Sequence, residues 1–217
     1  MVDFRVYLMS CRLLKIDEKN FEKVIKKAGK VVLSGGVVAM PTESFYGLAV
    51  NALNVEAIER LLQIKKRRED HPILILIPSS EALSRYVKRI PPVARKLMET
   101  FWPGGLTMVF EAGPILPSLL TGGTGEIGVR LSSHPVPTEL ARVAGVAITG
   151  TSANITGEPP CTNSEEVLKA LGAQIDLILD GGKTSGGKGS TVLDVAVTPP
   201  VILREGMVTR KALAPLL

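Results

Sequence analysis

Apolar runs rich in β-branched residues alternate along this chain with segments whose apolar residues recur every three to four positions. Runs of the first kind predict buried strands, and segments of the second kind predict amphipathic helices. The predicted strands cover residues 36–40, 73–77, 106–110, 127–131, 146–150, 176–180, 190–197 and 200–205. The predicted helices cover residues 21–36, 54–67, 91–102, 137–144, 164–172 and 209–217, with Asn54 and Ser164 as N-terminal caps.

This alternation predicts an α/β fold, and the strand-dense last third favours a twisted mixed sheet flanked by helices over strict βαβ repetition. The length of 217 residues suits one hydrophobic core, so we expect a single domain over residues 11–217. Residues 1–10 are expected to form an N-terminal extension. Arg5 interrupts their apolar character and no small-residue cleavage site follows, which argues against a signal peptide.

The composition excludes several classes of protein. No apolar run is long enough to cross a bilayer, so no membrane partner is expected. Cys11 and Cys161 are far apart, and His71 and His134 are the only histidines, so neither a disulfide framework nor a protein-held metal is predicted. The cysteine usage suits the cytoplasm. The net charge of +5 is compatible with phosphate-bearing partners without requiring nucleic acid.

Four segments rich in glycine and small polar residues adjoin the predicted strands: residues 41–47 (PTESFYG), 122–130 (GGTGEIGVR), 149–157 (TGTSANITG) and 181–191 (GGKTSGGKGST). Ligands of α/β proteins collect where such loops leave the strands, and their amides and hydroxyls donate hydrogen bonds to anionic oxygens. Turns are built from the same residues, but four clusters beside buried strands favour a polar ligand pocket.

The last of these segments resembles a phosphate-binding loop, with Gly182 as its first glycine and Gly187-Lys188 at the required spacing. However, Gly189 stands where a magnesium-binding hydroxyl is needed, and a strand rather than a helix follows. We therefore predict a flexible, lid-like loop before a strand, unless Ser190 or a lysine reaches the pocket.

Cations are placed where they could line the same pocket. Residues 65–68 (KKRR) end a predicted helix just before a buried strand, although a helix C-terminus alone also favours positive charge. Arg130 lies inside a predicted strand, where it either clamps a carboxylate or phosphate or forms a structural salt bridge. Arg204, beside Glu205, leaves the same two alternatives. The residues thus predict a concave basic pocket for a small molecule that carries phosphate or carboxylate groups.

Several motifs occur together and in a fixed order: PTESFYGLA, the K-x-R of Lys65-Lys66-Arg67, WPGGLT, GVRL, TSANITG, GSTVLD and LREG. In this set the chain resembles the threonylcarbamoyl-AMP synthases built on the YrdC-type domain, over nearly its whole length after about Cys11. The resemblance implies an enzyme that forms L-threonylcarbamoyladenylate and pyrophosphate from L-threonine, bicarbonate and ATP. It also implies that Mg²⁺ is carried by the ATP phosphates and that the product modifies an adenosine of tRNA through tRNA-modifying partner proteins.

The resemblance also implies roles for individual residues. The threonine pocket is expected to use Thr42, Tyr46, Arg130 and Ser190, with Arg130 on the carboxylate. The nucleotide is expected to contact Lys65, Arg67, Ser152, Asn154 and Arg204. Lys65 and Arg67 are the expected catalytic residues, because cations are needed where charge develops on the departing pyrophosphate.

The chain departs from the pattern in three places. Arg68 stands where many relatives have proline, no histidine occurs in residues 73–77, and the chain ends soon after LREG, as in the short single-domain members. We assign no catalytic role to His71. Two alternatives remain open: a module that binds double-stranded RNA or tRNA by charge and shape, and a paralogue that makes a different carbamoyl- or acyl-adenylate.

Overall fold

The computed structural model describes residues 11–217, so the predicted extension at residues 1–10 lies outside the described residues. The predicted mixed α/β fold is confirmed. The helices are α1 (Phe21–Leu33), α2 (Val55–Lys65), α3 (Pro92–Phe101), α4 (Ser118–Thr121), α5 (Pro135–Ala144), α6 (Ser164–Leu171) and α7 (Arg210–Leu213), with 3-10 turns at Glu81–Arg85 and Ala214–Leu216. The strands are β1 (Arg12–Lys15), β2 (Val38–Pro41), β3 (Tyr46–Ala49), β4 (Ile75–Leu76), β5 (Leu106–Glu111), β6 (Glu126–Arg130), β7 (Ile148–Thr149), β8 (Thr151–Ser152), β9 (Leu177–Asp180), β10 (Thr191–Asp194) and β11 (Val201–Arg204).

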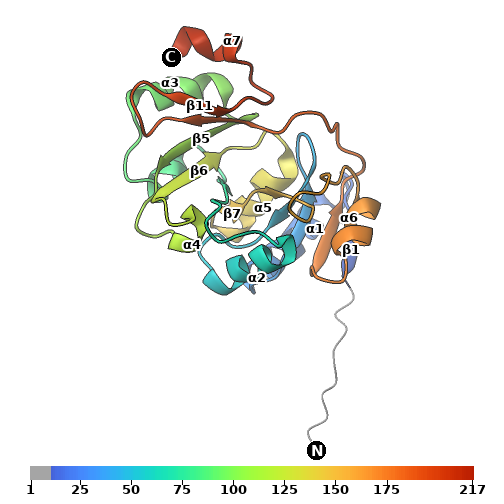
Figure 1. Cartoon of the computed structure of the whole chain (residues 1–217). Helices are drawn as coiled ribbons and strands as arrows, with labels where there is room; N and C mark the ends of the chain where they lie inside the picture. The colour runs from blue at the N-terminus through green and yellow to red at the C-terminus, as the bar shows by residue number, and fades with distance from the viewer. Residues whose placement is uncertain (1–10) are drawn as a thin grey trace, which may run out of the picture.

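The described strands are divided between two mixed sheets, where the sequence predicted one. The first sheet has the order β1-β9-β2-β3-β8, and the second has the order β11-β10-β5-β6-β4-β7. In Figure 1, β1 and α6 lie at one end of the molecule, and β11 with α3 and α7 lies at the other. The strand-dense last third explains the division, because β9 joins the first sheet while β10 and β11 join the second.

The helix ends follow from local side chains. Asn54 caps α2 as predicted, because its side chain accepts a hydrogen bond from the Ala57 amide at 2.9 Å. The prediction that Ser164 caps α6 was wrong. Asn163 has the extended backbone of a cap and accepts from the Glu166 amide at 2.9 Å, which makes Ser164 the first helical residue.

Some strands differ from the predicted ones. The apolar run at residues 73–77 contains only the two-residue strand β4, because the Ile73 amide donates to the carbonyl of Leu120, outside the sheets. Strands β1 and β3 were not predicted. β1 is an edge strand, largely exposed, so it lacks a buried apolar run. β3 pairs antiparallel with β2 and places the turn of residues 42–45 between them.

Strand β2 of the first sheet is buried on both faces, which explains why it reads as a continuous apolar run. Val38 and Met40 of β2 pack with α1 and α5 in one hydrophobic cluster, whereas Ala39 packs with β3 and α2 in the other. Successive side chains of a strand point to opposite faces, so a single strand serves both clusters. The core therefore holds β2 rigidly and fixes the place of the polar turn that follows it.

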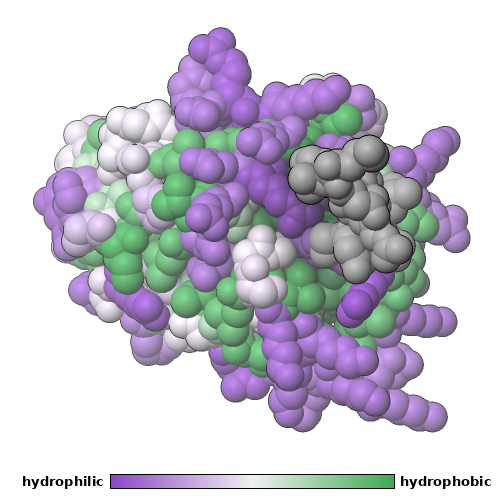
Figure 2. Space-filling model, turned by 90° about the horizontal axis from the view of Figure 1, so that it is seen from below, coloured by the Kyte–Doolittle hydropathy of each residue, from purple (hydrophilic) through white to green (hydrophobic). Residues whose placement is uncertain are grey.

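None of the helices in residues 11–217 combines the length and the apolar composition that crossing a membrane requires. Figure 2 shows one face of the molecule, on which long hydrophilic side chains surround smaller apolar areas.

Candidate functional site

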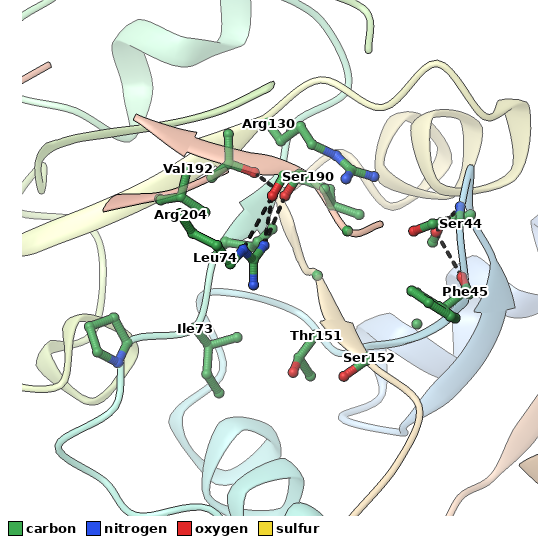
Figure 3. Close-up of a pocket in the computed structure, with 18 of the residues that line it drawn as sticks. Ser44, Phe45, Ile73, Leu74, Arg130, Thr151, Ser152, Ser190, Val192 and Arg204 are labelled. Carbon is green, nitrogen blue, oxygen red and sulfur yellow. Dashed lines mark hydrogen bonds between the residues drawn. The ribbon is translucent and has the colours of Figure 1, made fainter. Parts of the chain in front are cut away.

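A cavity of about 670 Å³ lies over one face of the second sheet. Alternate residues of neighbouring strands line it, and side chains two positions apart share a face, so its floor is the sheet itself. These residues are Thr107 and Val109 of β5, Gly128 and Arg130 of β6, and Val192 of β10. The turn after β2, strand β8 and the end of the loop at residues 181–190 also line the cavity, as do Arg67 and residues 72–74 (Figure 3).

Seven of the nine predicted site residues line this one cavity: Thr42, Tyr46, Arg67, Arg130, Ser152, Ser190 and Arg204. Lys65 and Asn154 do not line it. Figure 3 shows that Arg130, Ser190 and Arg204 lie close to one another, with Thr151 and Ser152 lower in the same view. Segments far apart in the sequence therefore meet in one place.

Positive charge predominates around the cavity. Four cations line it (Arg67, Arg130, Lys188 and Arg204) against two carboxylates (Glu126 and Glu205), an excess of two charges. Such an excess favours a ligand that carries phosphate or carboxylate groups. Among residues 11–217, no group of three or more His, Cys, Asp or Glu side chains is placed to hold a metal ion.

The turn between β2 and β3 contributes small polar side chains. Thr42 donates its hydroxyl hydrogen to the Phe45 carbonyl at 2.7 Å, and its Oγ1 lies 3.4 Å from the Ser44 amide. These bonds close the turn with its hydroxyl-bearing side chains at the cavity. The small polar side chains of Thr42 and Ser44 thus lie between two buried strands because this turn forms part of the cavity wall.

Tyr46 connects this turn to the glycine-rich loop at residues 181–190. Its hydroxyl donates to the Gly182 carbonyl at 2.8 Å and accepts from the Gly181 amide at 3.3 Å. Burial raises the pKa of Tyr46 to about 12, so the phenol is neutral at physiological pH. Tyr46 lines the cavity, but its hydroxyl is already engaged with the loop.

The glycine-rich loop does reach the cavity, through Lys188, Gly189 and Ser190. Gly186 and Gly187 have φ angles of +66° and +83°, which allow the chain to turn back toward the second sheet. Ser190 is held there by the Thr107 hydroxyl at 2.8 Å and, through its carbonyl, by Arg204 at 2.9 Å. The sequence predicted a flexible, lid-like loop unless Ser190 or a lysine reached the pocket. Both Lys188 and Ser190 line the cavity, so the exception applies.

The basic residues that follow Lys66 lie in different environments. Arg67 lines the cavity while its Nη2 donates to the Pro72 carbonyl at 2.8 Å. Arg68 is exposed and paired with Asp70 at 2.7 Å, as expected for a charged helix end. His71 is also exposed, lies 3.7 Å from Asp70 and does not line the cavity.

Lys65 is only 2% exposed and is surrounded by oxygen atoms of the TSAN segment. Its Nζ donates to the carbonyls of Ser152 and Asn154 at 2.6 and 2.9 Å, and to Asn154 Oδ1 at 3.1 Å. Burial, followed by the nearby charge of Arg67, lowers the pKa of Lys65 to about 8. The contact of Lys65 with a triphosphate stays a prediction, because an ammonium group has only these three donors.

Ser152 and Asn154 form a small network above Lys65. The Ser152 hydroxyl donates to Asn154 Oδ1 at 2.6 Å, and Asn154 Nδ2 donates to the Glu158 carbonyl at 2.5 Å. Ser152 lines the cavity, whereas Asn154 lies behind it. Asn154 therefore acts on the cavity through the position of Ser152.

Arg130 is 6% exposed and points from β6 into the cavity. Its Nη2 lies 2.5 Å from Oε2 of Glu43, so the structural salt bridge left open by the sequence is formed. Burial lowers the pKa of Arg130, whereas Glu43 raises it. Within residues 11–217, the Nε of Arg130 is buried and has no hydrogen-bond partner.

Glu43 is the residue that the sequence analysis missed, although it lies in the middle of the PTES turn. Its side chain is 8% exposed, and Oε1 accepts from the Ser132 hydroxyl and the Ser133 amide at 2.6 Å each. Burial alone would raise the pKa of Glu43, but Arg130 and these hydrogen bonds hold it below its usual value. A carboxylate beside a buried strand was the available signal, because such a group needs a partner.

A family model named Sua5_yciO_yrdC and described as "Telomere recombination" matches residues 30–206. The threonylcarbamoyl-AMP synthase of Pyrococcus abyssi is 38% identical over 89% of this chain and 57% of its own length. The threonylcarbamoyl-AMP synthase of Vibrio campbellii is 33% identical over 87% of this chain and 100% of its own length.

The crystal structure of P. abyssi Sua5 complexed with L-threonine superposes with a TM-score of 0.91 and 36% identity, covering 94% of this chain and 60% of that protein. The chain thus spans little more than half the length of its relative from P. abyssi, whereas it matches the relative from V. campbellii throughout.

Proposed function

Because this chain belongs to the Sua5/YciO/YrdC family, we propose that it forms L-threonylcarbamoyladenylate and pyrophosphate from L-threonine, bicarbonate and ATP. One observation carries the proposal: a single cavity gathers hydroxyl groups and cations from segments far apart in the chain. The name of the relatives from P. abyssi and V. campbellii supports the reaction, and the threonine complex of P. abyssi Sua5 supports the amino acid.

The carboxylate of threonine is proposed to bind Arg130. This guanidinium lines the cavity and Glu43 engages only part of its donors, and the Ser190 hydroxyl lines the same cavity. Thr42 and Tyr46 border the space beside them. A guanidinium suits a carboxylate because its planar donors match the two oxygens.

The reaction then has two steps. The neutral amine of threonine attacks the carbon of bicarbonate, water leaves, and a carbamate is formed. A carbamate oxygen attacks the α-phosphorus of ATP, and the bond to the β-phosphate oxygen breaks to release pyrophosphate. Arg67 and Arg204, with Lys188, supply positive charge where the pyrophosphate departs. Mg²⁺ enters the site on the ATP phosphates.

The proposal is tested by incubating the protein with ATP, Mg²⁺, bicarbonate and labelled L-threonine. We expect pyrophosphate and a labelled adenylate, both dependent on threonine. No pyrophosphate with any amino acid would contradict the enzyme, and a preference for serine would contradict the substrate only. Salt-sensitive binding of tRNA without turnover would favour the RNA-binding alternative. The adenylate is proposed to serve the modification of tRNA adenosine by partner proteins.

Arg67 and Arg68 offer a matched pair of variants. Arg67 lines the cavity, whereas Arg68 is exposed and pairs with Asp70. We expect Arg67→Ala to lower kcat/KM for ATP about 100-fold or more, since it removes charge next to the phosphates. Arg68→Ala should remain within about twofold of the wild type, because exposed pairs contribute little. Equal effects of the two variants would mean that both cations serve only the helix end.

A further inference from the structure

The carboxylate of Glu43 joins three parts of the molecule. It belongs to the turn after β2, yet it accepts hydrogen bonds from Arg130 at the end of β6 and from Ser132, Ser133 and the His134 amide before α5. The two residues of the ion pair are 87 positions apart in the chain. Glu43 therefore connects the first sheet to the second at the cavity.

Arg130 is only partly engaged by the protein. Its Nη2 is bound to Glu43 at 2.5 Å, whereas its Nε is enclosed without a partner in the described part of the chain. A guanidinium has five N–H donors, and Glu43 engages only part of those of Arg130, which lines the cavity. The geometry thus uses Nη2 to fix the side chain and leaves other donors of the same group for a ligand.

An arginine side chain that is not fixed must lose its rotamer freedom when a ligand binds, and this loss costs binding free energy. Glu43 removes that cost, because its own carboxylate is already immobilised by Ser132 and Ser133. His134 lies beside this carboxylate. Its Nδ1 accepts from the Val136 amide at 3.2 Å, and burial lowers the pKa of its imidazole.

The backbone of the same turn also anchors the glycine-rich loop. The Glu43 carbonyl accepts from the Ser185 hydroxyl at 2.6 Å, and the Ser44 carbonyl accepts from the Gly186 amide at 2.7 Å. This loop carries Ser190 to the cavity. Side chain and backbone of residue 43 thus act on the same end of the cavity.

We propose that Glu43 is a positioning residue that orients Arg130 so that its free edge receives the carboxylate of the amino-acid substrate. This inference rests on the proposed function, because it takes threonine as the ligand of Arg130. Glu43 does not touch the substrate in this arrangement. Its effect should appear in the affinity for threonine and not in the affinity for ATP, a split that a general loss of stability would not produce.

The test compares Glu43→Gln with wild type in calorimetric binding of L-threonine and of L-threoninol, which lacks the carboxylate. We expect the wild type to prefer threonine. Glu43→Gln should weaken threonine binding about tenfold or more and leave threoninol binding within about twofold, because neutral glutamine fixes the guanidinium less firmly. The KM for ATP should stay within about twofold of the wild-type value.

Glu139→Gln is the matched control. Glu139 of α5 also pairs with an arginine, Arg142, but it lies outside the cavity. This variant should bind threonine and threoninol as the wild type does. If Glu43→Gln does not fold, Ser132→Ala replaces it, since it removes one hydrogen bond to Glu43 without touching Arg130. It should weaken threonine binding about threefold, and no change would overturn the proposal.

The outcomes separate the two proposals. A wild-type protein that binds no threonine contradicts the proposed function and, with it, the role of Glu43. Wild-type binding that Glu43→Gln leaves unchanged overturns the positioning role and leaves the proposed function intact. Equal losses for threonine, threoninol and ATP would mean that Glu43 only stabilises the fold, which also overturns the inference.

Discussion

Two buried cations of this protein, Lys65 and Arg130, are held in different ways. Lys65 donates to three oxygen atoms of the TSAN segment, and all of them belong to uncharged groups. Arg130 is paired with the ionised carboxylate of Glu43 and keeps one buried nitrogen without a partner in the described residues. The first cation is saturated by the protein, and the second is not.

We propose that this difference separates a cation that shapes the site from a cation that binds the ligand. The three donors of the Lys65 ammonium are used within the protein, so we expect the group to act on a ligand through Ser152 and Asn154. The guanidinium of Arg130 has five donors in a fixed plane, and Glu43 occupies only part of them. Burial alone would not have distinguished the two residues, since both are nearly inaccessible to solvent.

The largest effect is expected for Arg130→Lys. Lysine keeps the positive charge near Glu43 but loses the planar donors that face the cavity. We expect kcat/KM for threonine to fall about 100-fold, equivalent to about 3 kcal/mol, while the free energy of unfolding changes by less than about 1 kcal/mol. Steady-state kinetics and urea unfolding measure the two quantities. An active variant with a normal KM for threonine would mean that charge alone matters at this position.

A smaller effect on turnover and a clear effect on stability are expected for Lys65→Met. The methionine fills a similar volume but leaves three oxygen atoms of Ser152 and Asn154 without their donor. The free energy of unfolding should fall by about 2–3 kcal/mol, and kcat/KM for ATP should fall about tenfold as Ser152 shifts. Urea unfolding and steady-state kinetics provide the measurements.

The neighbouring lysine provides the control for that variant. Lys66 is exposed and is the C-terminal cap that follows α2. Lys66→Met should therefore change neither the free energy of unfolding nor kcat/KM for ATP measurably. If Lys65→Met lost turnover at least 100-fold and kept its stability, Lys65 would contact the phosphates directly. The comparison between the two buried cations would then fail.

Much of this arrangement could be read from the sequence, and the exceptions have physical reasons. The apolar runs predicted most strands and helices, and seven of the nine residues that the motifs predicted for the site line the cavity. The motifs did not separate Lys65 from Arg67, because a helix end with adjacent cations does not reveal which side chain turns inward. Glu43 was missed because its partner Arg130 is 87 positions away, and only the fold brings them together.

The smallest effect concerns the pH dependence of stability, which tests the uncharged surroundings of Lys65. Burial, followed by the charge of Arg67, lowers the pKa of Lys65 from 10.5 to about 8, so the folded protein releases this proton before the unfolded chain does. Above pH 8 the unfolded state binds more protons, and the free energy of unfolding attributable to Lys65 must rise with pH. Between pH 7.5 and 9, the difference in the free energy of unfolding between wild type and Lys65→Met should grow by about 1 kcal/mol in urea unfolding.

Measurements stop at pH 9 because the raised pKa of Tyr46, about 12, makes stability fall with pH above 10. A difference that stays flat or shrinks would mean that the Lys65 ammonium is stabilised by negative charge, as Arg130 is by Glu43.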